Sequence, residues 1–383
     1  MTRVLFYVQS LLGVGHLKRA SLISRAMVDA GLDVAVVLGG PPDTKDNFEG
    51  CARIHLPPVR ASDPAFTTLI DEDGGPIDDA WRDRRAARLL SEASSLRPDV
   101  LLLEMFPFGR RQFRFELIPL IKAVRENRPP TKIVSSLRDV LVRKSNPERK
   151  AWSIKIASEL FDAILVHGDP DFIPLEMSFP EATHISDKLM YTGYVADRTD
   201  IAAEAALRED GRGEVIVSVG GGAVGEPLLR TALAARPLSR LSDVPWRLIA
   251  GVNCPDSVYD DLAWNAPPGV IVERWRTDLN LLLHHCQLSI SQGGYNTLMD
   301  LMAARARAVV VPFASESETE QSERARILAT RGAIHLLEAD ALTPHALASA
   351  VDAALSAQPW SLDLKCDGAR QTAQIITELC STA

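Results

Sequence analysis

The stretch that decides the fold reads Leu288-Ser289-Ile290-Ser291-Gln292-Gly293-Gly294-Tyr295-Asn296-Thr297. Its first four residues are typical of a short buried strand, the two glycines of a tight turn, and the remainder of the start of a helix. A helix N-terminus behind a glycine turn presents free backbone amides, which bind phosphate. The sequence therefore predicts a strand, turn and helix that hold a phosphorylated ligand. A turn without a ligand is the alternative interpretation.

Outward from this stretch, short apolar runs alternate with longer amphipathic segments along the whole chain. Many runs are continuous Val, Ile and Leu, as expected for strands covered on both faces. Alternating β and α segments predict parallel sheets with right-handed crossovers. The predicted strands are Val4–Val8, Asp33–Leu38, Arg53–Leu56, Val100–Leu103, Lys132–Ser135, Ala163–Val166, Glu214–Val219, Trp246–Ala250, Val270–Val272, Leu288–Ser291, Ala308–Val311 and Ala333–Leu336.

The length of 383 residues predicts two domains. Tyr191 to Val195 has the pattern of a last strand, and a polar stretch then leads to a new strand at Glu214. We therefore place the boundary between residues 198 and 199. The segment Leu56–Asp79 is rich in Pro, Asp and Gly, and is expected to be a long loop over the first domain.

Composition excludes several classes of protein. The net charge of −8 argues against a nucleic-acid binder. Five scattered cysteines form no CxxC pair, which fits a reducing cytoplasm and predicts neither disulfides nor a zinc site. The apolar run Val4–Val8 is too short for a signal peptide or a membrane span. Asp169-Pro170-Asp171 and Asp71-Glu72-Asp73 spell DxD, but a turn and a surface loop are favoured over a metal site for them.

Two further glycine turns follow predicted strands. The first strand runs into Gly13-Val14-Gly15-His16, where the glycines allow close approach of a ligand before a helix begins. The turn at Gly220-Gly221-Gly222 fits GxGxxG between a strand and a helix. A nicotinamide enzyme would carry a carboxylate at the end of the next strand, but Ala250 to Asn253 stands there. A phosphate-binding loop is therefore favoured over a dinucleotide site.

Candidates for acid–base chemistry lie near the ends of predicted strands. His16 begins the first helix, and its ordinary pKa near 6.5 suits a general base at neutral pH. Glu104 ends the strand Val100–Leu103, so it could hold the tautomer of His16 or act as the base itself. Helix capping is the competing interpretation for His16. Asp139 and Asp169 are rival bases, although capping and turn hydrogen bonds are favoured for both.

Several motifs together resemble MurG-like glycosyltransferases. The donor-site signature covers Ser291 to Asp300, Val311 to Phe313, and Glu320 to Ala325. The wider chain is similar to a bacterial family of predicted glycosyltransferases over nearly its full length. The motifs that carry this second resemblance are Gly13–Ala20, Phe106–Leu117, Ser136–Asp139, His167–Pro170 and Tyr191–Val195.

The resemblance implies an α/β protein of the GT-B fold, in which two Rossmann-like domains with parallel sheets face a central cleft. Residues 1–198 would bind the acceptor, residues 199–364 would bind the donor, and a helix at about 365–383 would pack back onto the first domain. The implied activity is inverting and metal-independent. It moves a hexose or N-acetylhexosamine from a UDP sugar to a hydroxyl acceptor, such as a glycan or glycolipid precursor, without a cofactor.

The same resemblance implies the residues that hold the donor. The Asp300 carboxylate would bind the ribose, Glu320 and Gln321 would reach the sugar hydroxyls, and Trp275 would lie beside the uracil. The chain departs from the family where Trp275 replaces a smaller aromatic residue and Asp300 replaces a glutamate. The expected donor set is Gly13, Gly15, Gly220, Gly221, Gly222, Trp275, Arg276, Ser291, Gly293, Gly294, Asn296, Thr297, Asp300, Glu320 and Gln321.

The acceptor side carries basic residues. Phe106–Phe115 interleaves aromatic residues with three arginines, a pattern that fits an acidic acceptor, a lipid phosphate or the inner face of the membrane. An equally good interpretation places the phenylalanines in the core and the arginines in solvent. The acceptor-side candidates are Arg110, Arg111, Arg138, Asp139 and Asp169.

Two other functions fit the same residues. A nucleotide-sugar 2-epimerase acting on UDP-N-acetylglucosamine would use the donor site without a separate acceptor. A non-catalytic nucleotide-sugar sensor would bind the donor tightly whether or not His16 is present. Incubation with the donor alone separates the epimerase from the transferase, and the sequence leaves the acceptor and the oligomeric state open.

Overall fold

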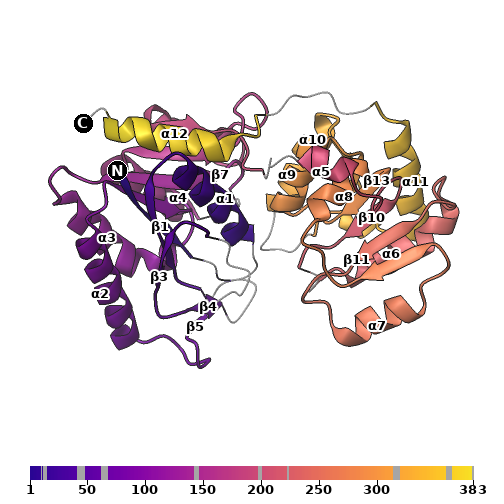
Figure 1. The fold of residues 1–383 in the computed structure, drawn as a ribbon, viewed down its shortest axis with the longest axis horizontal. Coiled ribbons are helices and arrows are strands. Elements are labelled where there is room, and N and C mark those ends of the chain that lie inside the picture. Colours follow the sequence, from indigo (N-terminus) through magenta and orange to yellow (C-terminus); the bar gives the residue numbers. More distant parts are fainter. Residues whose placement is uncertain are drawn as a thin grey trace. The chain divides into compact units, whose positions relative to one another are not determined.

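The computed structural model describes residues 1–9, 11, 15–40, 48–61, 68–141, 146–196, 201–221, 224–313, 320–358 and 365–381, with the backbone alone at residues 15, 201–203 and 320. The chain forms two compact units (Figure 1). Unit 1 comprises Met1–Ala196 and Lys365–Ala383, and unit 2 comprises Asp197–Leu364. The boundary predicted between residues 198 and 199 lies outside the described residues.

Unit 1 is built on a seven-stranded parallel sheet of order β3-β2-β1-β6-β7-β8-β9. Its strands form because their apolar runs are buried on both faces, as in β1, where Val4 to Val8 are completely buried. The strand bounds are β1 Arg3–Val8, β2 Asp33–Leu38, β3 Ala52–His55, β6 Val100–Glu104, β7 Lys132–Arg138, β8 Ala163–His167 and β9 Leu189–Tyr191.

Helices cover both faces of this sheet. On one face, α1 and α12 pack against Val4 and Phe6, and on the other α2 and α3 pack against Leu5 and Tyr7. The sides alternate because successive side chains of a strand point in opposite directions. The Asp78 side chain caps α2 by accepting a hydrogen bond from the Trp81 amide. The helix bounds are α1 Gly15–Asp29, α2 Asp79–Leu96, α3 Arg114–Arg125, α4 Pro147–Leu160 and α12 Gly368–Ser381, with 3-10 turns at Arg111–Phe113, Leu175–Met177 and Pro180–Lys188.

Unit 2 repeats this plan with a six-stranded parallel sheet of order β12-β11-β10-β13-β14-β15. The strand bounds are β10 Val215–Ser218, β11 Trp246–Ile249, β12 Val270–Glu273, β13 Leu288–Ser291, β14 Ala308–Val310 and β15 His335–Leu336. The helix bounds are α5 Ile201–Ala206, α6 Glu226–Ala235, α7 Asp256–Trp264, α8 Leu279–His285, α9 Tyr295–Ala304, α10 Glu320–Thr330 and α11 Pro344–Ser356, with 3-10 turns at Arg236–Leu238 and Ala339–Ala341. Its main core joins β10 to α6 and α11.

The end of the described chain belongs to unit 1. Figure 1 shows α12, in yellow, among the indigo and purple elements of that unit, and it packs along α1. The returning segment pairs with the departing one, because the Tyr194 amide donates to the Lys365 carbonyl at 2.7 Å and Val195 bridges Asp367 in an antiparallel arrangement. The segment that leaves for unit 2 and the segment that returns therefore lie side by side.

The structure differs from the sequence-based expectation at two places. The predicted loop Leu56–Asp79 contains two short antiparallel strands, β4 Arg60–Ala61 and β5 Leu69–Ile70. The predicted strand at Tyr191–Val195 is shifted, because β9 ends at Tyr191 and Gly193 has a φ of +84°. Strands of two or three residues are too short to show the alternation of side chains by which a strand is predicted from sequence. Among the described residues, no helix is long and apolar enough to cross a bilayer.

Candidate functional site

Each sheet reverses its order once, and the candidate residues gather at these two points. In unit 1 the order turns between β1 and β6, and in unit 2 between β10 and β13. Ligands of open α/β sheets bind outside the carboxyl ends of the strands at such a reversal, because the loops there diverge and leave a crevice. The loops after β1 and β6 lead to His16 and Arg110, and those after β10 and β13 carry the two glycine turns of unit 2.

The centre of the unit 1 site is the buried carboxylate of Glu104, the last residue of β6. Its Oε1 accepts a hydrogen bond from the Nδ1 of His16 at 2.5 Å and is also bound by the Arg19 guanidinium. His16 and Arg19 lie three residues apart on α1, which places them on the same face of that helix. Burial alone would raise the pKa of Glu104, but the two cationic or donating neighbours outweigh it and lower that pKa. Glu104 is therefore an anion that orients the imidazole.

Arg138, the last residue of β7, completes the surroundings of the imidazole. Its Nη2 donates to the Nε2 of His16 at 2.8 Å. A guanidinium can only donate, so Nε2 must be the accepting nitrogen and Nδ1 must carry the proton. Burial lowers the pKa of His16 to about 3 against the opposing effect of Glu104, and Arg138 and Arg110 lower it further. The ring is therefore neutral, with its basic nitrogen occupied.

The loop after β6 holds Arg110 in an uncommon backbone conformation. Met105 and Arg110 have φ angles of +65° and +56°, in the left-handed region that residues with a side chain seldom adopt. Such residues cost on the order of 1 to 3 kcal/mol each and cluster at functional sites. Arg110 donates through Nε to the carbonyl of Gln9 at 2.9 Å, which fixes it beside the segment that follows β1.

A buried polar network supports that segment from below. The side-chain oxygen of Gln9 accepts from Arg85 at 2.6 Å, and its amide donates to the Gly39 carbonyl at 3.0 Å. Arg85 is also paired with Glu116 at 2.8 Å, and the Tyr7 hydroxyl bonds to the same carboxylate. The side chains of the network are fully buried, and they hydrogen-bond to one another and to the backbone. The backbone that leads to His16 therefore has a rigid base.

The other acceptor-side candidates have structural partners. Asp139 is buried and accepts a hydrogen bond from the Val140 amide at 2.9 Å. Asp169 accepts one from the Asp171 amide at 3.1 Å and lies 3.6 Å from the Nζ of Lys365. Arg111 stacks over the Trp152 ring, with its guanidinium 4.8 Å from the ring centroid. These contacts favour the turn interpretation for the two aspartates and place Arg111 outside the His16 cluster.

In unit 2 the two glycine turns leave neighbouring strands at the same level. Ser218 and Ser291 end β10 and β13, and they are paired residues in the sheet. Gly221 accepts from the Asn253 amide at 2.8 Å through its carbonyl, and the Gln292 side chain donates to the Val224 carbonyl at 3.2 Å. These hydrogen bonds join the loops after β10, β11 and β13 into one surface.

The turn after β13 requires its first glycine. Gly293 has a φ of +68°, and a Cβ at this position would lie 2.5 Å from the Val310 side chain. Gly294 caps α9, and a Cβ there would meet no described residue within 4 Å. The described residues thus leave space in front of the α9 N-terminus, where helix amides and the helix dipole favour an anion.

Polar side chains follow on α9 and α10. Asn296 and Thr297 occupy the first turn of α9, and Asp300 lies one turn later and is largely buried. Gln321 lies in the first turn of α10, and its Oε1 is buried without a hydrogen-bond partner among the described residues. A buried acceptor without a partner is rare and requires an explanation, such as a ligand hydroxyl that reaches it.

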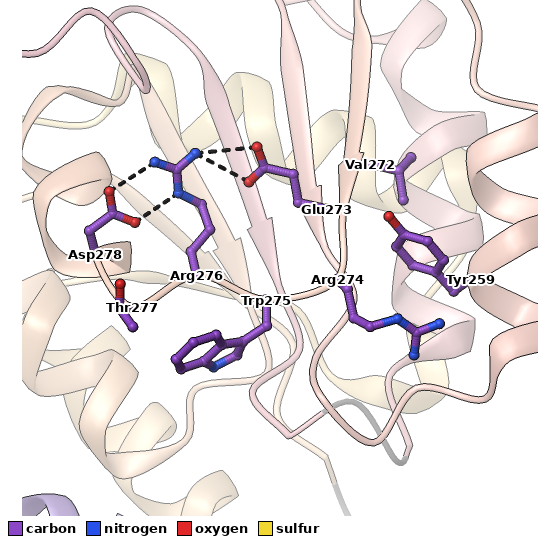
Figure 2. A pocket seen from close by; sticks show the side chains of 8 residues that line it. All are labelled: Tyr259, Val272, Glu273, Arg274, Trp275, Arg276, Thr277 and Asp278. Atoms are coloured by element: carbon purple, nitrogen blue, oxygen red, sulfur yellow. Dashed lines mark hydrogen bonds and ion pairs between the residues drawn. The ribbon is translucent and has the colours of Figure 1, made fainter. Parts of the chain in front are cut away.

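A pocket of about 520 Å³ lies next to the end of β12, and Figure 2 shows the side chains that line it. Trp275 is 42% exposed and points away from the charged residues beside it. On the other side, the Arg274 guanidinium lies 4.4 Å from the centroid of the Tyr259 ring. The pocket is lined by Tyr259, Val272, Glu273, Arg274, Trp275, Arg276, Thr277 and Asp278.

Ion pairs hold the backbone of this pocket in place. Arg276 donates twice to Asp278 at 2.8 Å and also contacts Glu273 at 3.2 Å. Glu273 in turn pairs with Arg247 at 2.5 Å, and Arg247 pairs with Glu214. The Arg276 hydrogen bonds lower the pKa of Asp278. Arg276, predicted to touch the donor, therefore fixes the position of Trp275 while its guanidinium is engaged by carboxylates.

Some predicted residues lie outside the described part of the chain, and some contributors were missed. Gly13, Gly222 and the side chain of Glu320 fall in the first group, and only the backbone of Gly15 is described, as the start of α1. Arg19 was missed, although its spacing from His16 places it on the same helix face. Gln292 was also missed, and no sequence signal distinguishes its role in joining two loops.

Unit 2 contains a segment that is similar to a known domain family. Residues 216–364 match the glycosyltransferase family 28 C-terminal domain. This family 28 domain begins within β10 and contains both glycine turns and the pocket at Trp275. Enzymes with this domain take a sugar from a nucleotide-sugar donor.

A curated protein of Nitrosospira multiformis is similar over part of the chain. It is a UDP-N-acetylglucosamine--N-acetylmuramyl-(pentapeptide) pyrophosphoryl-undecaprenol N-acetylglucosamine transferase, 27% identical over 199 residues. The match covers 51% of this chain and 52% of that protein, so it spans about half the length of each.

Solved structures of glycosyltransferases share the fold of this chain over nearly its whole length. MurG of Acinetobacter baumannii matches with a TM-score of 0.60 and 14% identity, covering 100% of both chains. The calicheamicin glycosyltransferase CalG4 matches with a TM-score of 0.61 and 13% identity, covering 98% of this chain and 94% of that one. Phytolacca americana UGT2 matches with a TM-score of 0.58 and 12% identity, covering 100% and 95%. The fold is therefore GT-B, as the sequence predicted, and the match of residues 216–364 to the family 28 domain agrees with the resemblance to MurG-like proteins.

Proposed function

We propose that the protein is an inverting, metal-independent glycosyltransferase that moves a hexose or N-acetylhexosamine from a UDP sugar to a hydroxyl acceptor. The observation that carries the proposal is the pair of glycine turns after β10 and β13. They leave paired strand ends at the reversal of the sheet, and hydrogen bonds join their loops. The donor diphosphate would lie against their amides and the α9 N-terminus, whose partial positive charge stabilises the leaving group.

The remaining donor contacts follow from the same surface. Trp275 offers an exposed aromatic face to the uracil, and Asp300 offers a carboxylate to the ribose. Gln321 would pair its buried oxygen with a sugar hydroxyl. The related Nitrosospira enzyme uses UDP-N-acetylglucosamine according to its name, so this compound is the first donor to test.

The chemistry at the other substrate falls to unit 1. His16 would take the proton of the acceptor hydroxyl on Nε2 while Glu104 binds Nδ1–H and stabilises the imidazolium that forms. The acceptor oxygen bonds to the anomeric carbon as the bond to the diphosphate breaks, and the diphosphate leaves with the electron pair. A single displacement of this kind inverts the anomeric centre.

Calorimetry of donor binding tests the proposal. UDP-N-acetylglucosamine should bind the wild type, and Asp300→Ala should weaken it at least tenfold, about 1.4 kcal/mol, with Asp300→Asn between the two. Asp340→Ala, at an exposed position in the same unit, is the matched control and should bind normally. Equal affinity in Asp300→Ala and wild type would show that the donor site is elsewhere.

Turnover assays separate the transferase from the alternatives. Release of UDP should persist in EDTA, and NMR should show the sugar in the opposite anomeric configuration. Conversion of the donor into a different intact nucleotide sugar would instead identify an epimerase. Tight donor binding with no turnover for any acceptor would identify a binding protein.

A further inference from the structure

The surroundings of His16 conflict with its proposed role as a base. The lone pair on Nε2, which must receive the acceptor proton, already accepts a hydrogen bond from Arg138 at 2.8 Å. Glu104 occupies the opposite nitrogen at 2.5 Å, so both nitrogens of the ring are engaged. With Arg138 in this position, no hydroxyl group can reach the basic nitrogen.

Among the described residues, more guanidinium groups than carboxylates act on the His16 ring. Three guanidinium groups, those of Arg19, Arg110 and Arg138, act on the single carboxylate of Glu104 or on the ring that it binds. Glu104 binds His16 and Arg19 through Oε1, and its Oε2 is buried without a hydrogen-bond partner among the described residues. Guanidinium groups match phosphate oxygens in geometry and charge, so an arginine at this edge of the sheet is well suited to a phosphoryl ligand.

The positions of the arginines differ in a way that separates their roles. Arg19 is buried within α1 and bound to Glu104, whereas Arg138, the last residue of β7, and Arg110, in the loop after β6, are only half-buried. Arg110 is held there by the left-handed backbone and by the Gln9 carbonyl. Arg138 ends β7, at the sheet edge where α/β ligands bind.

We propose that Arg138 is a positioning residue that blocks Nε2 of His16 in the ligand-free protein and releases it when a phosphoryl group of a substrate binds Arg138 and Arg110. This inference rests on the proposed function, because it assumes that His16 is the base. On binding, the Arg138 guanidinium turns from the imidazole to the phosphoryl oxygens. Nε2 then becomes free to accept the hydroxyl proton, and deprotonation is thereby linked to the presence of the charged substrate.

The imidazole nitrogens of His16 report this exchange directly. In ¹⁵N spectra assigned by His16→Gln, ligand-free wild type should show the neutral Nδ1–H form down to about pH 5. Inorganic pyrophosphate should raise the titration midpoint by at least one pH unit, a tenfold change in proton affinity. Arg138→Gln should raise the midpoint without pyrophosphate and remove most of the response to it, and Arg138→Lys should give an intermediate result.

A matched control and a second measurement keep the test decisive. Arg128→Gln changes an exposed arginine of unit 1 and should titrate as wild type. A simple field effect of the bound anion would shift His16 equally in wild type and Arg138→Gln, and that outcome overturns the proposal. So does a midpoint that Arg138→Gln leaves unchanged, or the absence of any response to pyrophosphate in the wild type. Circular dichroism establishes that each variant folds.

The source of the phosphoryl group is found by comparing two probes. If the donor diphosphate supplies it, UDP should shift His16, and Asp300→Ala should remove that shift. If the acceptor supplies it, methyl phosphate should shift His16 equally in wild type and Asp300→Ala. These titrations need no turnover, so failure of the proposed glycosyl transfer and failure of the Arg138 release are separate results.

Discussion

At the scale of single residues, the pair His16 and Glu104 yields the sharpest expectation for activity. His16→Gln keeps a donor for the Glu104 carboxylate but removes the basic nitrogen. Turnover should fall about 10²- to 10⁴-fold, because that is the usual contribution of a general base, while the donor dissociation constant changes less than twofold. UDP release and calorimetry measure the two quantities. A loss of less than tenfold in turnover would assign the base to another residue.

A second histidine predicts how stability depends on pH. His167 is fully buried, with its nitrogens 2.7 Å from the Ser136 hydroxyl and 2.9 Å from that of Thr192. Burial, with a smaller effect from Arg19, lowers its pKa to about 3. Below pH 6.5 the unfolded chain takes up a proton that the folded protein does not. The free energy of unfolding should therefore fall as the pH drops from 6.5 toward 3, by up to about 1.4 kcal/mol per pH unit.

His167→Gln removes the contribution of His167 to this dependence, while keeping an amide that can bond to both hydroxyls. Urea unfolding at pH 7, 6 and 5 should show the difference between wild type and variant moving in favour of the variant as the pH falls. His184→Gln, at an exposed site, is the control and should follow the wild type. Parallel curves for wild type and His167→Gln would mean that His167 is protonated in the folded protein.

At the scale of elements, the turn between β13 and α9 offers a matched pair of glycines. Gly293→Ala forces a left-handed backbone on alanine and places its Cβ 2.5 Å from Val310, so it should destabilise unit 2 by about 2 to 4 kcal/mol. Gly294→Ala meets no neighbour and should leave stability nearly unchanged. Its methyl group nevertheless enters the space assigned to the diphosphate, so donor affinity should fall at least tenfold. Thermal unfolding and calorimetry measure the two effects, and unchanged affinity in Gly294→Ala would place the phosphates elsewhere.

The sequence predicted the elements whose pattern is local and strong. Continuous apolar runs located β1, β6, β10 and β13, and the glycine pairs located the turns that follow the last two. Strands β4 and β5 were missed because two residues each carry no period.

Local sequence patterns did not predict the contacts between elements that are far apart in the sequence. Glu104 was predicted near His16 because Glu104 ends a strand and His16 begins the helix that follows another strand at the same edge of the sheet. The hydrogen bond from Arg138 to Nε2 of His16 was not predicted. It depends on the strand order β1-β6-β7 and on how far β7 extends past β6. The salt bridges of Arg276 with Asp278 and Glu273 were also missed, although these residues are neighbours in sequence, because the sequence does not show how the loop after β12 folds.

At the scale of the whole molecule, unit 1 depends on residues from both ends of the described chain. Ala373 and Ile376 of α12 are buried in the same core as Ile23 and Met27 of α1. Removal of residues 366–383 should therefore loosen unit 1 and leave unit 2 intact. Hydrogen exchange should accelerate in α1 and β1 and stay unchanged in β10 and β13. Ile376→Ala should cause a milder form of the same change, on the order of 2 to 5 kcal/mol. Equal acceleration in both units would contradict the division.

The adjacency of Tyr194 and Lys365 has a consequence for protein engineering. The chain leaves unit 1 and returns to it at hydrogen-bonded neighbours, so unit 2 is topologically an insertion into unit 1. A linker of a few residues in place of residues 197–364 would join the two segments of unit 1 without straining its backbone. The corresponding unit of a related protein could then be inserted at the same place in unit 1, and the proposed function predicts that unit 1 would still determine the acceptor.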